Sequence, residues 1–79
     1  MLTVYSTADC GYCHRLKTQL DREEIPYTNV DVEQDQDAAE YVMSVNGGNR
    51  VVPTVRFTDG TALTNPTIVD VKNQLATIG

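Results

Sequence analysis

Residues 2–20 read LTVYSTADCGYCHRLKTQL and place two cysteines between two different hydrophobic patterns. In residues 2–6, apolar and polar side chains alternate, which predicts a short β-strand. After the first cysteine, apolar residues are spaced three and four positions apart, as on one buried face of a helix: Cys13, Leu16 and Leu20. The Cys10-Gly11-Tyr12-Cys13 segment therefore lies where a strand passes into a helix.

The next segment, residues 27–32, predicts a second strand. Thr28, Val30 and Val32 alternate on one of its faces. Because a helix connects the two strands, we expect them to be parallel, as in a βαβ unit.

A second helix is expected to start at Asp37, with Glu40 completing a capping box. Asn46-Gly47-Gly48 should end it, since glycine tolerates the backbone of a helix C-terminus. Its expected packing face consists of Ala38, Ala39, Val42, Met43 and Val45.

Residues 54–58 and 61–64 flank Asp59-Gly60, which predicts a hairpin with a two-residue turn. Asn65 is expected to cap the last helix, with Pro66 at its first position. The apolar stripe of this helix is Ile68, Val71, Leu75 and Ile78. The sequence thus predicts an α/β fold, β-α-β-α-β-β-α, as one domain over residues 1–79 with helices on both sheet faces.

Composition limits the possible partners of the chain. A net charge of −5 without a cluster of Lys and Arg argues against binding nucleic acid. No segment approaches the length of a transmembrane helix, so no membrane partner is expected. Residues 1–5 show no signal-peptide pattern, which favours a reducing compartment, the cytoplasm.

The position of Cys10 and Cys13 favours redox chemistry. Residues three apart in the first turn of a helix lie on one face, where a disulfide closes easily. Unpaired N–H groups and the positive end of the helix favour a thiolate there. We therefore expect Cys10 to be the exposed nucleophile and Cys13 to resolve the mixed disulfide.

Metal binding and haem attachment are the competing interpretations of the two cysteines. Zinc sites also use C-x-x-C, but the chain has only two Cys and one His. With His14, the motif also matches the C-x-x-C-H haem-attachment signal, for which the chain offers no well-placed second ligand. Met43 is expected in a helix core. We expect no bound metal and no bound cofactor.

Val52-Pro53 precedes the third strand and has two interpretations. Proline is tolerated at the start of a strand. Alternatively, the bond is cis and faces the dithiol, leaving the Val52 backbone to pair with an extended thiol substrate.

Taken together, these motifs resemble the glutaredoxin family over nearly the whole chain, and most of all its mycoredoxin branch in actinobacteria. The segments that carry the resemblance are residues 10–13 (CGYC), 44–50 (SVNGGNR), 52–55 (VPTV) and 63–66 (LTNP). The resemblance implies a thioredoxin-like fold, sheet order 2-1-3-4 and a cis proline beside the site. It also implies mycothiol as co-substrate, mycothiolated proteins as partners and a monomer.

Two departures from relatives bear on the thiol. Asp9 stands where mycoredoxins often have Trp, and its charge should oppose a thiolate at Cys10. Thr64-Asn65 replaces a Gly-Gly segment that holds a carboxylate in glutathione users, and Pro66 lacks an N–H. Glutathione is therefore the less expected co-substrate, although Arg15, Lys17 and Arg50 could attract an anionic thiol. The substrate-binding residues implied are Tyr12, Val52, Pro53, Thr64 and Asn65.

Two other functions remain open on the sequence. One is an NrdH-like redoxin or glutaredoxin that reduces protein disulfides with electrons from thioredoxin reductase or glutathione. Redoxins that are reduced by thioredoxin reductase are expected to have an aromatic C-terminal signature, whereas this chain ends Ala76-Thr77-Ile78-Gly79. The other is an iron–sulfur module in which Cys10 and external thiols bridge a cluster between two chains. The colour of the purified protein distinguishes the cluster module from an oxidoreductase, because an iron–sulfur cluster absorbs visible light.

Overall fold

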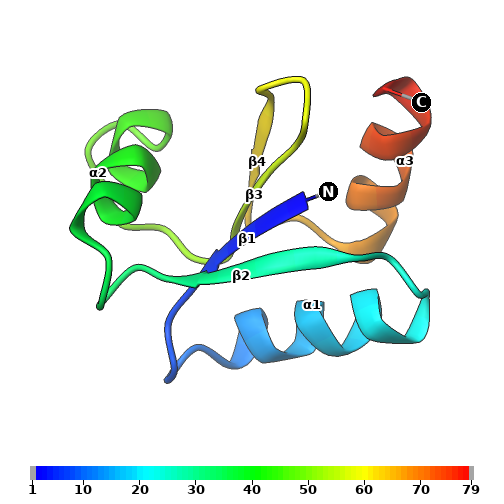
Figure 1. The fold of residues 1–79 in the computed structure, drawn as a ribbon, viewed down its shortest axis with the longest axis horizontal. Coiled ribbons are helices and arrows are strands. Elements are labelled where there is room, and N and C mark those ends of the chain that lie inside the picture. The colour runs from blue at the N-terminus through cyan, green and yellow to red at the C-terminus, as the bar shows by residue number, and fades with distance from the viewer. Residues whose placement is uncertain (1, 79) are drawn as a thin grey trace.

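The computed structural model describes residues 2–78; Met1 and Gly79, which the one-domain prediction includes, lie outside the described residues. The element order matches the predicted β-α-β-α-β-β-α order (Figure 1). The elements are β1 (Leu2–Ser6), α1 (Gly11–Arg22), β2 (Tyr27–Asp31), α2 (Gln36–Val45), β3 (Thr54–Arg56), β4 (Ala62–Thr64) and α3 (Ile68–Ile78).

The four strands form one mixed sheet in the order β2-β1-β3-β4, as predicted. β1 and β2 are parallel, with Leu2 opposite Tyr27 and Ser6 opposite Asp31. β3 runs antiparallel to β1, and β4 antiparallel to β3. Cys10 and Cys13 follow β1, so they lie just beyond the end of a central strand of the sheet.

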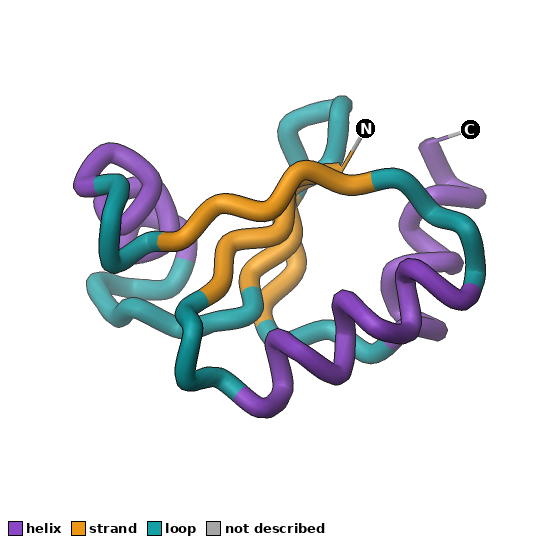
Figure 2. The backbone as a smooth tube through the Cα atoms, turned by 60° about the horizontal axis from the view of Figure 1, so that its bottom comes forward, coloured by secondary structure: helices purple, strands orange, loops and turns teal. Residues whose placement is uncertain are grey.

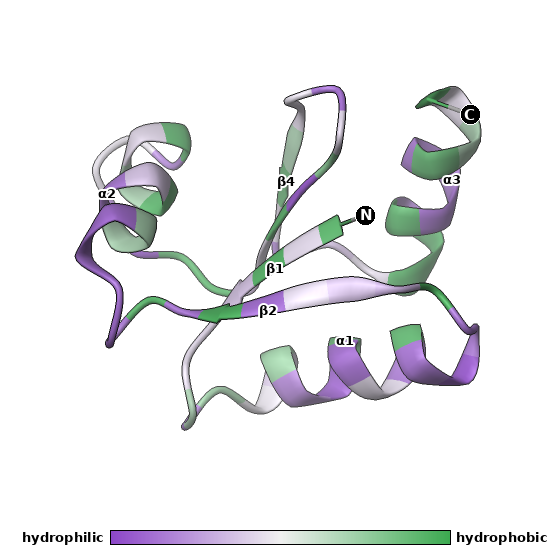
Figure 3. Cartoon of the chain, viewed as in Figure 1, coloured by the Kyte–Doolittle hydropathy of each residue, from purple (hydrophilic) through white to green (hydrophobic). Residues whose placement is uncertain are grey.

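Helices cover both faces of the sheet, with α1 and α3 on one side and α2 on the other (Figures 1 and 2). The apolar residues of α1 face the sheet, and its polar residues lie on the outer side (Figure 3). The core under α1 and α3 contains Leu2, Val4, Leu16, Leu20, Val55, Phe57 and Val71. The core under α2 contains Tyr5, Val32, Ala38, Ala39 and Val42. No helix within residues 2–78 has the length and apolarity needed to cross a membrane.

The predicted cap of α2 is wrong by two residues. Asp35, not Asp37, has the extended backbone of a cap (φ −132°, ψ 102°), and its carboxylate accepts the N–H of Ala38 at 3.1 Å. Asp37 already lies in the first turn. A capping residue must stand just outside the helix, and both aspartates have the right side chain. The packing face is also shorter than predicted, because Val45 is exposed.

The hairpin loop contains three residues, Thr58 to Gly60, not two. Phe57 donates its N–H to the carbonyl of Thr61 at 2.8 Å, so these two residues close the loop. Gly60 has φ 91° and donates its N–H to the carbonyl of Phe57 at 3.0 Å. This arrangement is a tight turn followed by a left-handed residue, the form that three-residue hairpin loops commonly take.

Thr67 caps α3, so the prediction that Asn65 caps it is also wrong. The Thr67 hydroxyl accepts the N–H of Asp70 at 3.1 Å, and the Asp70 carboxylate accepts the N–H of Thr67 at 3.0 Å. This reciprocal pair is a capping box. Asn65 instead has φ 46° and donates its N–H to the Pro53 carbonyl at 2.7 Å. This hydrogen bond to Pro53 fixes the backbone of Asn65 beyond the end of β4, so that Thr67 is the residue that caps α3.

Candidate active site

Cys10 occupies the N-cap of α1, with the extended backbone that a cap requires (φ −91°, ψ 108°). Its Sγ accepts the N–H of Cys13 at 3.1 Å, as the oxygen of a serine or aspartate cap would. The Cys10 side chain is half-buried. The N–H group and the positive end of the helix both stabilise negative charge on this sulfur.

Cys13 lies on the inner face of α1 and is fully buried, as predicted. Burial raises the pKa of its thiol to about 12, and a hydrogen bond with Cys10 acts in the same direction. The backbone of Thr7 and the charge of Lys17 lower that pKa, but they are outweighed. At neutral pH, Cys13 is therefore a protonated thiol beside a sulfur at the surface.

The Val52-Pro53 bond is cis, as the second of the two interpretations of this proline predicted; the pairing of Val52 with a substrate stays a prediction. The Cys10 thiol lies 3.8 Å from the Val52 carbonyl oxygen, to which it donates a weak hydrogen bond. Pro53 is buried. The segment before β3 thus forms the wall that faces the first cysteine.

Asn46, which the sequence marked only as a helix end, holds this wall in place. Its amide donates to the Val42 carbonyl at 2.8 Å and to the Thr54 hydroxyl at 3.2 Å. Its carbonyl accepts the hydroxyl of Thr64. Thr54, fully buried, donates in turn to the Val51 carbonyl at 2.7 Å. Sequence reasoning missed this network, although a threonine at a predicted strand start was a possible signal.

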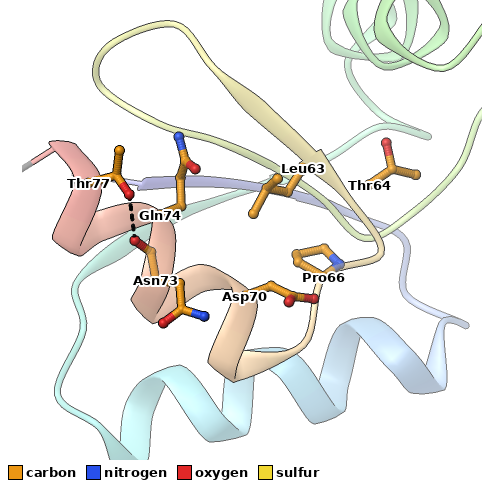
Figure 4. A pocket seen from close by; sticks show the side chains of 7 residues that line it. All are labelled: Leu63, Thr64, Pro66, Asp70, Asn73, Gln74 and Thr77. Carbon is orange, nitrogen blue, oxygen red and sulfur yellow. Dashed lines mark hydrogen bonds between the residues drawn. The ribbon is translucent and has the colours of Figure 1, made fainter.

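The predicted substrate-binding residues fall into three places, of which the wall with Val52 and Pro53 is the first. Tyr12, 69% exposed, and Asn65 line a groove of about 360 Å³ between α1 and the start of α3. The Thr64 side chain instead lines a neighbouring pocket of about 250 Å³ between β4 and α3. In Figure 4, Leu63 and Pro66 lie between these two elements, and Thr64 lies apart from the α3 side chains.

His14 and Asp9 flank the dithiol without forming a metal centre. The Nε2 atom of His14 lies 2.8 Å from the Ala8 carbonyl, to which it donates when protonated, and so it braces the loop before Cys10. Asp9 is exposed. Across residues 2–78, no three His, Cys, Asp or Glu side chains gather closely enough to hold a metal ion.

Known proteins share both the sequence and the fold. The family model described as Glutaredoxin matches residues 2–62. A Mycobacterium tuberculosis protein described as a glutaredoxin is 57% identical over 77 residues, covering 98% of this chain and 92% of the relative. Mycoredoxin 1 of Corynebacterium glutamicum is 51% identical over 70 residues, covering 89% and 86%. The structure of NrdH-redoxin from Escherichia coli has a TM-score of 0.75 at 26% identity, covering 94% and 92%.

Proposed function

The chain belongs to the glutaredoxin family and is a thiol–disulfide oxidoreductase with a C-x-x-C motif; from this premise, we propose that it reduces mixed disulfides between proteins and mycothiol. The 51% identity to Mycoredoxin 1 supports the choice of thiol. One observation supports the route: Cys10 caps a helix at the surface, whereas Cys13 is buried with a pKa of about 12. Cys10 can therefore act as the nucleophile without Cys13, as the reduction of a mixed disulfide by a single cysteine requires.

In the first step, the Cys10 thiolate attacks the mycothiol sulfur of the mixed disulfide. A new S–S bond forms between Cys10 and mycothiol, and the protein–mycothiol bond breaks. The protein sulfur leaves as a thiolate and takes a proton from water, so the target regains its free thiol while the disulfide passes to Cys10. The N–H of Cys13, 3.1 Å from the Cys10 sulfur, stabilises the attacking anion.

In the second step, the thiolate of another mycothiol attacks the mycothiol sulfur bound to Cys10. Mycothiol disulfide leaves, and Cys10 returns as the thiolate. The two steps together convert the mixed disulfide and one added mycothiol into the free protein thiol and mycothiol disulfide. Cys13 offers a side route, in which its thiolate attacks Cys10 and releases mycothiol, forming the intramolecular disulfide.

We assign the thiol substrate to the wall and groove around Cys10. The Val52 backbone pairs with the extended substrate, and Pro53 shapes that wall. Tyr12 and Asn65 contact the rest of the thiol from the groove. Thr64 acts through Asn46, to which its hydroxyl is bonded, and so supports the frame of the site.

The start of α3 supports mycothiol over glutathione. Asp70 places a carboxylate at this helix end and accepts the N–H of Thr67. A helix N-terminus binds an anion through its free N–H groups, and here the chain's own carboxylate takes that place. Glutathione carries carboxylates that would meet this charge, whereas the thiol portion of mycothiol carries none.

The remaining parts of the proposal concern the setting. We propose that residues 1–79 act as one domain, because both cores pack on the same sheet. We further propose that the protein works as a monomer in the cytoplasm, where low-molecular-weight thiols keep such a dithiol reduced.

The test compares two cysteine variants on two substrates. One target protein is prepared as its mycothiol and its glutathione mixed disulfide, and turnover of each is measured side by side. We expect faster turnover with mycothiol, no activity in Cys10→Ser and retained activity in Cys13→Ser. Equal loss in both variants would indicate a dithiol route, and faster turnover with glutathione would refute the choice of thiol.

A reductase-fed protein-disulfide reductase is the second candidate. The E. coli NrdH-redoxin, whose activity profile is thioredoxin-like, shares this fold with a TM-score of 0.75. That route requires both cysteines, so the Cys13→Ser result separates the two candidates.

A further inference from the structure

A groove lies between α1 and the start of α3, and the thiol exchange described above does not use most of its lining. On the α1 side it is lined by Tyr12, Arg15 and Gln19, whose spacing of three and four residues places them on one helix face. Asn65 and Thr67 line the opposite side. The groove, of about 360 Å³, therefore begins at Tyr12, between the two cysteines in sequence, and extends along α1 to Gln19.

The lining combines an exposed aromatic ring with unpaired carboxamides. Tyr12 is 69% exposed, so its ring face is open to a ligand. Within residues 2–78, the side-chain amides of Gln19 and Asn65 form no hydrogen bond with the protein. Each amide offers both a donor and an acceptor, which matches a hydroxyl group that needs both.

The charge of the groove is low and of one sign. Arg15 is the only charged side chain that lines it in the described part of the chain. Glutathione brings two carboxylates and an ammonium group, of which this lining can pair with one carboxylate. A neutral ligand rich in hydroxyl groups brings no charge that needs a partner and uses the ring and the amides together, while Arg15 stays exposed to water.

We propose that the groove formed by Tyr12, Arg15, Gln19 and Asn65 binds the sugar portion of a carbohydrate-bearing thiol. The inference rests on the proposed function and deepens it by naming the part of the substrate that is recognised. One sugar ring lies with its apolar C–H face on Tyr12, and its hydroxyls bond to the two amides. Cys10 and Gln19 stand about 13 Å apart along the helix axis, at 1.5 Å per residue, which accommodates a cysteine unit followed by two rings.

The experiment measures preference for the sugar, not activity alone. One target protein is prepared as its mixed disulfide with mycothiol and with N-acetylcysteine amide, which has the same uncharged thiol end without sugars. The measured quantity is the ratio of kcat/KM for the two. We expect this ratio to fall about three- to tenfold in Gln19→Leu and in Tyr12→Leu, as loss of one or two ligand contacts implies.

Two further variants test the cause. Tyr12→Phe keeps the ring and should keep the ratio. Gln36→Leu makes the same chemical change at the exposed start of α2, far from the groove, and should also keep it. In wild type, the glucosamine–inositol pseudodisaccharide without its cysteine should shift the side-chain amide signals of Gln19 and Asn65 in NMR spectra.

The outcomes separate the two proposals. If wild type does not prefer mycothiol over N-acetylcysteine amide, the proposed function fails in its choice of thiol, and the groove inference fails with it. If wild type prefers mycothiol while Gln19→Leu and Tyr12→Leu match Gln36→Leu, only the groove inference is overturned. Absence of amide shifts with the pseudodisaccharide would overturn it as well, even if a variant failed to fold.

Discussion

The buried thiol of Cys13 should make the intramolecular side route slow at neutral pH and steeply dependent on pH. With a pKa of about 12, only about one Cys13 side chain in 10⁵ is a thiolate at pH 7. Because the thiolate is the attacking species, the rate should rise about tenfold for each pH unit. A mycothiol adduct removes the charge of Cys10, one cause of the raised pKa, but leaves burial, the largest cause.

The assay follows a single turnover of that step. Enzyme carrying mycothiol on Cys10 is moved to buffers between pH 6 and pH 9, quenched with acid and weighed as intact protein. We expect loss of the adduct mass with a logarithmic slope near one across this range, and no loss in Cys13→Ser. A plateau by pH 8 would refute the reasoning, because it would mean that Cys13 is already ionised there.

Three further predictions concern stability, each measured as a shift in the urea unfolding midpoint. Gly60→Val should lower the free energy of unfolding by more than about 1 kcal/mol, because φ is 91° at this position; an unchanged midpoint would contradict the turn described. Thr67→Ala should lower it by about 1 kcal/mol through loss of the α3 cap, whereas the neighbouring exposed Val69→Ala should have a smaller effect. Asn46→Ala should lower it by about 1–3 kcal/mol, because the buried Thr54 loses a donor; equal midpoints in variant and wild type would rule out a structural role for that network.

The β-α-β half and the dithiol could be predicted because they depend on local periodicity. Helical spacing after Cys10 requires only that one face of the helix be buried. Alternation in residues 2–6 indicates a strand, although β1 is buried on both faces, with Leu2 and Val4 in one core and Tyr5 in the other. Cys13, Leu16 and Leu20 are buried as that spacing requires. The spacing predicts a helix that starts close to Cys10; the hydrogen bond from the Cys13 N–H to the Cys10 sulfur is a finding of the structure.

The caps could not be predicted because residue type does not distinguish neighbouring candidates. Asp35 and Asp37 are both good caps, as are Asn65 and Thr67. The choice at α3 depends on a contact remote in sequence, the 2.7 Å hydrogen bond from the Asn65 N–H to the Pro53 carbonyl. That contact holds Asn65 on the sheet edge in a left-handed conformation.

The same limit applies to the candidate site. Asn46 acts by joining the end of α2 to β3 and β4, three segments that no local pattern brings together. Thr64 was predicted as a substrate contact from its motif, yet its hydroxyl is taken by Asn46. Residues whose role depends on tertiary hydrogen bonds therefore need the fold before they can be assigned.

The two helix ends beside the site are used in opposite ways, and the proposed chemistry needs both. The N-terminus of α1 is capped by a sulfur that accepts an N–H and can leave that position to react. The N-terminus of α3 is capped by a hydroxyl and a carboxylate that do not take part in the exchange. The positive end of α1 therefore faces the sulfur of Cys10, whereas at α3 a carboxylate of the chain already accepts an N–H group at the helix end. The group at each cap thus decides what that helix end does: at α1 it is the reacting sulfur, and at α3 it is a pair of side chains that stabilises the start of the helix.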